Sequence, residues 1–251
     1  AVATSESGMI AAHADWSIDP RKRWVAVAGR TQRGWRMAAP CPAWPDAAFL
    51  STLVAMGRGA PVALGVDLPL GLPRAFAPHA GAEDFPAFLR GLDRPGWERF
   101  FEVAPTLSDI SDRRPFYPAR GARGMTRLSH AARLGFADAS GLSRACDRAT
   151  VERPAGAPLF WTLGANQSGK AAIAAWRGVL LPALRSGADI ALWPFQGGLL
   201  DLLSPGRVVL AEPHHVGKLV RVGVADDMDV LVVTTGLGEA RQRRLHELPL
   251  V

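Results

Sequence analysis

The sequence predicts an α/β fold with a mixed β-sheet, in the element order β-β-β-α-β-α-β and with helices on both faces of the sheet. Three observations support this fold. Short apolar runs bounded by turn residues predict strands, longer apolar stretches have helical spacing, and a Pro/Arg-rich stretch at about residues 68–160 interrupts the alternation. We therefore treat residues 1–251 as a single domain, with that stretch as a large insertion after the fourth strand.

The individual elements follow from these patterns. "MIAAHADWS", "KRWVAVAGR" and "GWRMAAP" predict the first three strands, "PDAAFLSTLVAMGRG" the first helix, and "VALGV" a buried strand that runs into Asp67. A second helix is predicted over residues 166–186, kinked or split by Pro182. The strand "ADIALWPFQ", a short "GGLLDLLS" piece and a strand "GRVVLAEP" that ends in Glu212 follow it.

The bulk composition is that of an ordinary globular protein. Hydrophobic residues make up 48% and charged residues 21% of the chain, which is enough for a sizeable core. No run of 18 apolar residues and no signal-peptide pattern is present, so we expect no membrane partner. Cys41 and Cys146 are too few for a disulfide framework or a cysteine metal cage. We therefore expect a cytoplasmic location.

The charge balance points to an anionic partner. The net charge is +6 and the sequence pI is about 10.3, which favours nucleic acid first. Only three of the 29 basic residues are lysines, and the chain is rich in Ala, Gly and Pro. Because genome composition bias produces the same pattern, the charge alone is a modest argument for nucleic acid.

The stretch "TLGANQSGKAAIAAW" nearly spells a phosphate-binding loop, G-x-x-x-x-G-K-[ST]. The matching residues are Gly164, Gly169 and Lys170. Ala171 stands where the motif needs a hydroxyl for Mg²⁺, and Pro154 and Pro158 leave room for only a short apolar run before the loop. We therefore favour a helix start capped by Asn166 or Ser168 over a nucleotide site.

Three carboxylates follow predicted strands: Asp15, Asp67 and Glu212. In this element order the first strand lies beside the fourth, which brings Asp15 and Asp67 to neighbouring carboxyl ends, where open α/β sheets bind ligands. The pattern predicts a shared acidic site that holds Mg²⁺ or Mn²⁺, which prefer oxygen ligands. The competing interpretation is that each Asp caps the turn after its strand. His214 and His215, just beyond Glu212, are either ligands or loop residues.

Several segments carry a family resemblance: "ADWS", "GVDLPLGLP", "RACDRAT", "FWTLGANQSGKAAIAAWRGVLLPAL", "LWPFQG" and "VVLAEPHH". The chain resembles the bacterial and archaeal family of predicted RNase H-like nucleases, and the likeness covers most of residues 10–215. It implies an RNase H-like fold and a metal-dependent nuclease. After Glu212 the chain departs from the family, and residues 216–251 are a divergent segment. This leaves open a fourth site carboxylate, for which the candidates are Asp226, Asp227, Asp229 and Glu239.

An Arg-rich loop, "SDRRPFYPARGARGMTRLSHAAR", supplies candidate phosphate contacts. Arg binds phosphate with two parallel hydrogen bonds, and Phe116 and Tyr117 could stack on a base. The predicted nucleic-acid-binding residues are Arg113, Arg114, Arg120, Arg123, Arg127 and Lys170. The alternative is a solvated loop of an Arg-rich protein.

Three functions are consistent with these patterns. The first is a metal-dependent phosphodiesterase or nuclease in which Asp15, Asp67 and Glu212 are both catalytic residues and metal ligands, with Asp67 as the bridging ligand. The second is a catalytically silent RNase H-like module that binds nucleic acid. The third is an actin-like or sugar-kinase-like ATPase, which needs a glycine-rich turn that "DWSIDPRKRW" lacks.

Overall fold

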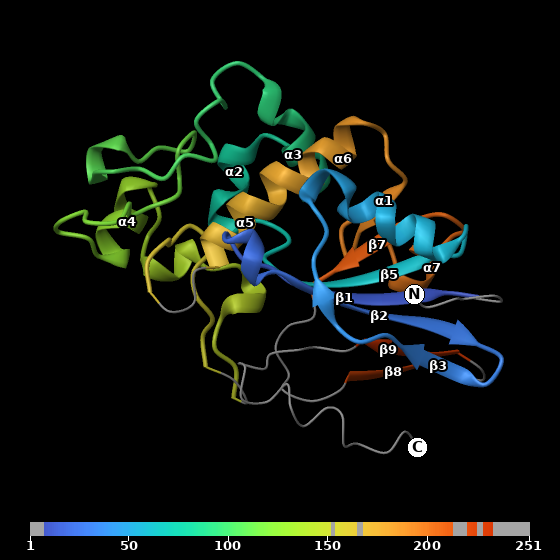
Figure 1. Cartoon of the computed structure of the whole chain (residues 1–251). Helices are drawn as coiled ribbons and strands as arrows, with labels where there is room; N and C mark the ends of the chain where they lie inside the picture. The colour runs from blue at the N-terminus through green and yellow to red at the C-terminus, as the bar shows by residue number, and fades with distance from the viewer. Residues whose placement is uncertain (1–7, 152–153, 165–167, 213–219, 225–227, 233–251) are drawn as a thin grey trace.

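The computed structural model of the chain describes residues 8–151, 154–164, 168–212, 220–224 and 228–232. Its centre is a seven-stranded mixed sheet in the order β3-β2-β1-β5-β7-β6, with β4 paired to β2 (Figure 1). The predicted α/β class with a mixed sheet is therefore confirmed. The finer RNase H-like assignment stays a prediction.

The first half of the sheet is an antiparallel meander. β1 (Ile10–Asp15) pairs with β2 (Trp24–Thr31), and β2 pairs with β3 (Gly34–Met37) and with the two-residue β4 (Cys41–Pro42). β5 (Val62–Asp67) then lies parallel to β1 on the side away from β2. The predicted parallel pairing of the first and fourth long strands is confirmed.

Two more parallel strands extend the sheet beyond β5. β7 (Val208–Ala211) pairs with β5, and β6 (Ile190–Leu192) pairs with the far side of β7. The sequence predicts both strands. It does not predict that the later strand lies between β5 and β6, nor that β4 exists.

Helices cover one face of the sheet (Figure 1). These are α1 (Asp46–Gly57), α5 (Ser168–Ala175) and α6 (Leu181–Arg185), with a π-helical turn at Trp176–Leu180 between the last two. The predicted interruption of the second helix near Pro182 is confirmed by this turn.

The opposite face of the sheet carries the short helix α7 (Leu199–Leu202). Leu202 packs there against Ala191 and Val209, whereas their strand neighbours Leu192 and Leu210 face the main core. Helices therefore lie on both faces, as the sequence predicts.

The segment 68–160 contains little regular structure. Its helices are α2 (Ala77–Ala80), α3 (Phe85–Arg90) and α4 (Arg127–Arg133). Single 3₁₀ turns occur at Arg74–Phe76, Gly91–Asp93, Leu107–Asp109, Ala139–Leu142 and Ala145–Asp147, and one more precedes β2 at Pro20–Lys22.

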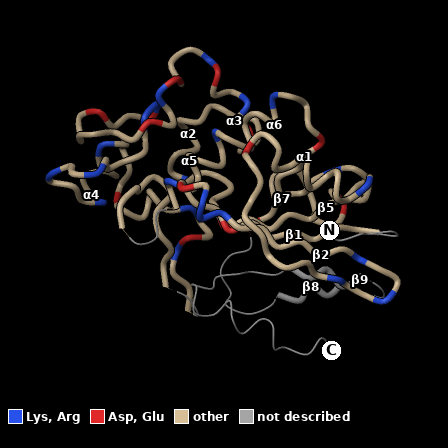
Figure 2. Tube along the Cα trace, viewed as in Figure 1, with Lys and Arg blue, Asp and Glu red and all other residues tan. Residues whose placement is uncertain are grey.

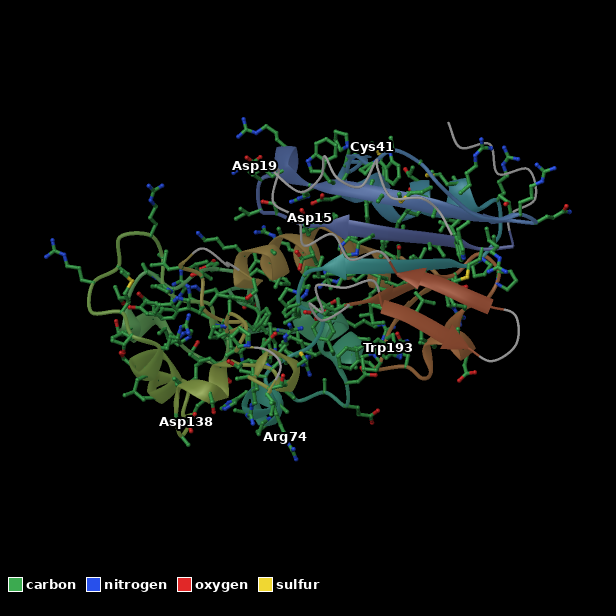
Figure 3. All side chains as sticks on the ribbon, turned by 90° about the horizontal axis from the view of Figure 1, so that it is seen from below. Asp15, Asp19, Cys41, Arg74, Asp138 and Trp193 are labelled. Carbon is green, nitrogen blue, oxygen red and sulfur yellow. The ribbon has the colours of Figure 1, made fainter. Side chains whose placement is uncertain are left out.

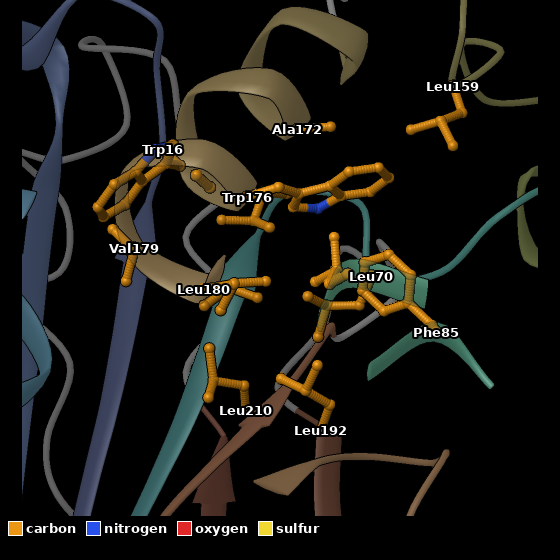
Figure 4. Close-up of a cluster of buried hydrophobic side chains, with 14 of the residues drawn as sticks. Trp16, Leu70, Phe85, Leu159, Ala172, Trp176, Val179, Leu180, Leu192 and Leu210 are labelled. Atoms are coloured by element: carbon orange, nitrogen blue, oxygen red, sulfur yellow. The ribbon is translucent and has the colours of Figure 1, made fainter. Parts of the chain in front are cut away.

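Aromatic side chains join this segment to the sheet core. Phe76 contacts Phe88 and Phe160 edge to face, with ring centroids 6.3 and 4.9 Å away. Trp176, fully buried on the π-helical turn, contacts Phe85, whose ring centroid is 4.9 Å away (Figure 4). The segment and the sheet therefore share one continuous hydrophobic core.

Within the divergent C-terminal segment, β8 (Val220–Val224) and β9 (Met228–Val232) form an antiparallel pair, and β9 contacts β1. Among the helices described, none has the length and apolar character needed to cross a membrane.

Candidate functional site

Asp15 and Asp67 end two neighbouring parallel strands. Asp15 is the register partner of Asp67, and the two strands are paired over their full six-residue lengths. Because side chains alternate along a strand, register partners point to the same face of the sheet. The predicted meeting of the two carboxylates is confirmed. Figure 3 shows Asp15 at the end of β1 that is directed towards the segment 68–160.

The surroundings of this pair disfavour the state in which both carboxyl groups are ionised. Burial raises the pKa of the Asp15 carboxyl, and repulsion from Asp67 raises it further. Asp15 is half-buried, and His13, on the same face two residues earlier, is only 4% exposed. A proton or a bound cation would therefore stabilise this carboxylate pair.

The loop after Asp15 is held in place by a buried arginine. Arg23 is 4% exposed, its guanidinium lies 4.5 Å from the centroid of the Trp16 ring, and its Nε donates to the Ser17 carbonyl at 2.6 Å. It also forms an ion pair with Asp46 at the start of α1. These contacts fix the direction of the chain immediately after Asp15.

The loop after Asp67 is held by three separate contacts. The Leu70 amide donates to Glu212 Oε2 at 2.7 Å, and the Leu70 carbonyl accepts from Arg144 Nη1 at 3.0 Å. The Trp176 indole donates to the Pro69 carbonyl at 2.7 Å. The buried "LPL" that follows Asp67 therefore has a fixed backbone path.

Arg144 is the centre of a buried ion-pair network. It is 4% exposed, and it donates to both carboxylate oxygens of Asp147, each at 2.8 Å. It also donates to Glu212 Oε1 at 2.7 Å and to Glu212 Oε2. Burial opposes the charge of Arg144, but its hydrogen bonds to the carboxylates of Glu212 and Asp147 outweigh burial and raise its pKa. The guanidinium is therefore a permanent cation between two carboxylates.

This network corrects the predicted role of Glu212. β7 ends at Ala211, the register partner of Gly65, so Glu212 lies just beyond the end of the strand. Nowhere in the described chain do three His, Cys, Asp or Glu side chains form a group that could hold a metal ion. Among the described residues the predicted three-carboxylate cluster is not formed, because the Glu212 carboxylate accepts hydrogen bonds from Arg144 and from the Leu70 amide.

The side chains of the remaining candidate ligands lie outside the described part of the chain. His214, His215, Asp226, Asp227 and Glu239 lie outside the described residues, and for Asp229 only the backbone on β9 is described. Asp15 and Asp67 alone still fit a hard divalent cation, since they offer carboxylate oxygens side by side.

Sequence reasoning missed Arg144 and Arg23. In "RACDRAT", burial raises the pKa of the Cys146 thiol, which disfavours a nucleophilic thiolate. The signal that could have revealed Arg144 is its spacing of three residues from Asp147, which allows the ion pair within one 3₁₀ turn.

Two of the predicted nucleic-acid contacts are structural. The Arg113 guanidinium lies 3.7 Å from the centroid of the Trp97 ring, and Arg114 forms an ion pair with Glu102 at 3.1 Å and donates to the Val103 carbonyl at 3.1 Å. Phe116 and Tyr117 are fully buried. The predicted base stacking by this aromatic pair is therefore wrong, because both rings belong to the core.

The other predicted contacts remain available on the surface. Arg120, Arg123 and Arg127 are exposed, and Lys170 is half-buried on α5. The Arg127 guanidinium lies 5.8 Å from the centroid of the Trp161 ring. These residues stay predicted phosphate contacts.

The near-match to a phosphate loop is explained by packing. Gly169 belongs to the first turn of α5, and a Cβ at this position would lie 2.4 Å from the Leu159 carbonyl oxygen. Glycine is required because the helix start touches the backbone of residues 159–161. The preceding described residues form no strand, so the helix-start interpretation is confirmed. Ser168 begins α5, and Asn166 lies outside the described residues.

Comparison with known proteins gave no match to a family model, to a curated protein or to a solved structure.

Proposed function

We propose that the protein is a metal-dependent phosphodiesterase that cleaves nucleic acid, with Asp15 and Asp67 as the ligands of Mg²⁺ or Mn²⁺. The observation that carries the proposal is the register pairing of these two residues at the carboxyl ends of adjacent parallel strands. The raised pKa of Asp15 supports it, because a cation would relieve the repulsion from Asp67.

Two protein carboxylates are an adequate anchor for this chemistry. Mg²⁺ keeps several waters and is commonly held by one or two carboxylates together with the phosphates of the substrate. A cation bound here would polarise the phosphoryl oxygen and stabilise the charge that develops on the leaving oxygen. The phosphodiester itself would complete the ligand shell, which removes the need for Glu212 as a third ligand.

The chain's own residues would keep the two carboxylates in place. Arg23 fixes the backbone after Asp15, and Arg144 with Glu212 fixes the backbone after Asp67. Rigid positioning matters because a ligand pair that moves apart by about 1 Å loses much of its effect. The exposed Arg120, Arg123 and Arg127 supply positive charge for a polyanionic substrate.

A cleavage assay tests this function. Single- and double-stranded DNA and RNA would be incubated with wild type, Asp67→Asn and the control Asp93→Asn, in Mg²⁺ or Mn²⁺. Asp93 is an exposed surface carboxylate, so the control makes the same charge change away from the strand ends. We expect Asp67→Asn to lower cleavage by more than about a hundredfold, since loss of even an outer-shell partner costs 10–100-fold. Cleavage that survives this substitution would refute the proposal.

A catalytically silent nucleic-acid-binding module is the second candidate. It is favoured by the commitment of Glu212 to Arg144, which leaves two rather than three carboxylates at the strand ends. Binding of nucleic acid without cleavage in either metal would support this alternative. No observation in the described chain favours the actin-like or sugar-kinase-like ATPase.

A further inference from the structure

A groove lies beside the start of α4. It has a volume of about 420 Å³ and is lined by Arg127, Ser140, Ser143, Arg148 and Gly156, among others. We call it the α4 groove. Its size falls within the range of pockets that hold small organic ligands, and both of its charged lining residues are cations.

The two arginines of the groove are available for a ligand. Arg127 and Arg148 are exposed, and no salt bridge involves either of them within the described residues. Figure 2 shows further Lys and Arg positions around α4. Exposed guanidinium groups that line one groove suit a phosphate group, because each can donate two parallel hydrogen bonds to its oxygens.

Two acidic residues near the groove are held by hydrogen bonds. Asp147 is bound by Arg144 through both oxygens. Asp138 accepts hydrogen bonds from Ser140, which lower its pKa, and the charge of Arg148 adds to this effect. Asp138 stays ionised, so the positive charge of the groove comes from its two lining arginines, and no carboxylate of the described residues belongs to the lining.

One short segment connects the groove to the carboxylate pair. Ser143 and Arg148 line the groove, and Arg144, between them in the sequence, donates to the Leu70 carbonyl three residues after Asp67. The groove residues that would contact phosphate therefore lie on the same short segment as Arg144, which holds the loop after Asp67.

We propose that the α4 groove binds the phosphodiester backbone of the nucleic-acid strand whose reacting phosphate lies at Asp15 and Asp67. This inference rests on the proposed function and adds the surface that holds the substrate. The contacts are with phosphate, so they are common to DNA and RNA and carry no base information.

The test is a binding titration in EDTA with fluorescein-labelled single strands, one of oligothymidylate and one of oligouridylate. The variant is Arg127→Gln/Arg148→Gln, and the matched control is Arg33→Gln/Arg36→Gln, which removes two exposed charges from the β2–β3 hairpin. We expect the groove variant to lose about tenfold in affinity for both strands, as loss of charged hydrogen bonds implies. The magnitude of the salt slope should fall by about 1.4, at about 0.7 for each lost contact.

The control variant should bind both strands as wild type does, and thermal unfolding would verify that both variants are folded. Equal losses in the two variants would overturn the proposal, because binding would then follow net charge alone. Unchanged binding in the groove variant would also overturn it. Competition by polyglutamate as strong as that by unlabelled oligonucleotide would show a general polyanion surface and would contradict a phosphate site.

The result is separable from the proposed function, because EDTA removes the cation from the experiment. A groove that binds nucleic acid in a protein without cleavage activity would leave the phosphate contacts of the groove standing while the phosphodiesterase fails. If the groove variant bound and cleaved nucleic acid as wild type does, the groove inference would fail and the proposed phosphodiesterase would stand.

Discussion

Asp15 and Asp67 are register partners on two parallel strands, and each is the last residue of its strand. Burial and mutual repulsion act on this pair, and each following loop is held by a buried arginine, Arg23 or Arg144. Like charges held close together destabilise the folded state and are typical of functional sites. The predictions below follow from this arrangement.

The first prediction concerns the pH dependence of stability in EDTA. The pKa of Asp15 is raised above its ordinary value of 3.8, so the folded state binds this proton more tightly than the unfolded state does. Stability from this group is complete below pH 3.8 and falls as the pH rises through the folded pKa. Asp15→Asn removes this loss of stability at higher pH, so it should raise the melting temperature at neutral pH by about 2–4 °C. Thermal unfolding that shows a lower melting temperature at neutral pH would contradict this.

The second prediction separates a positioning role of Glu212 from a role as ligand. Arg144→Met leaves two buried carboxylates without their cation and should lower the free energy of unfolding by about 3–5 kcal/mol. Glu212→Gln keeps an oxygen that can accept from the Leu70 amide, so it should cost only about 1–2 kcal/mol. Urea titration measures both effects. Calorimetry should find unchanged Mn²⁺ affinity in Glu212→Gln, and a large loss would restore Glu212 as a ligand.

The third prediction concerns the buried His130. Burial lowers its pKa from 6.5 to about 4, and its Nε2 donates to the Pro115 carbonyl at 2.8 Å. The unfolded chain therefore takes up this proton first as the pH falls. Stability from this group is present above pH 6.5 and is lost between pH 6.5 and about 4.

This loss amounts to about 3 kcal/mol in total, at 1.36 kcal/mol per pKa unit. His130→Gln, which retains a donor, should flatten the profile of melting temperature against pH in that window. A profile as steep as that of wild type would show that other groups cause the acid sensitivity.

The sequence was sufficient for the part of the fold that positions the carboxylates. Apolar runs that end in Asp15 and Asp67 predicted two strands, and the order of elements predicted that they are parallel neighbours. These two strands are predictable because a buried parallel strand appears in a sequence as a continuous apolar run. The position of β7 between β5 and β6 depends on tertiary packing, which the local pattern does not encode.

The roles of individual side chains are harder to predict from the sequence, for a physical reason. Phe116 and Tyr117 lie in a Pro/Gly-rich stretch, where spacing does not tell a buried ring from an exposed one. Glu212 ends an apolar strand just as Asp67 does, and only the three-dimensional position of Arg144 shows that its carboxylate is already bound. Long-range ion pairs leave no periodic signal in a sequence, so these roles could not be predicted from it.

The central claim is that Asp15 and Asp67 together hold a divalent cation. Calorimetric titration of Mn²⁺ into wild type, Asp15→Asn, Asp67→Asn and Asp93→Asn tests it most directly, without any assumption about substrate. We predict that wild type and Asp93→Asn bind with equal affinity and that each strand-end variant loses at least about 10–100-fold. Equal Mn²⁺ affinity in all four proteins would contradict the account.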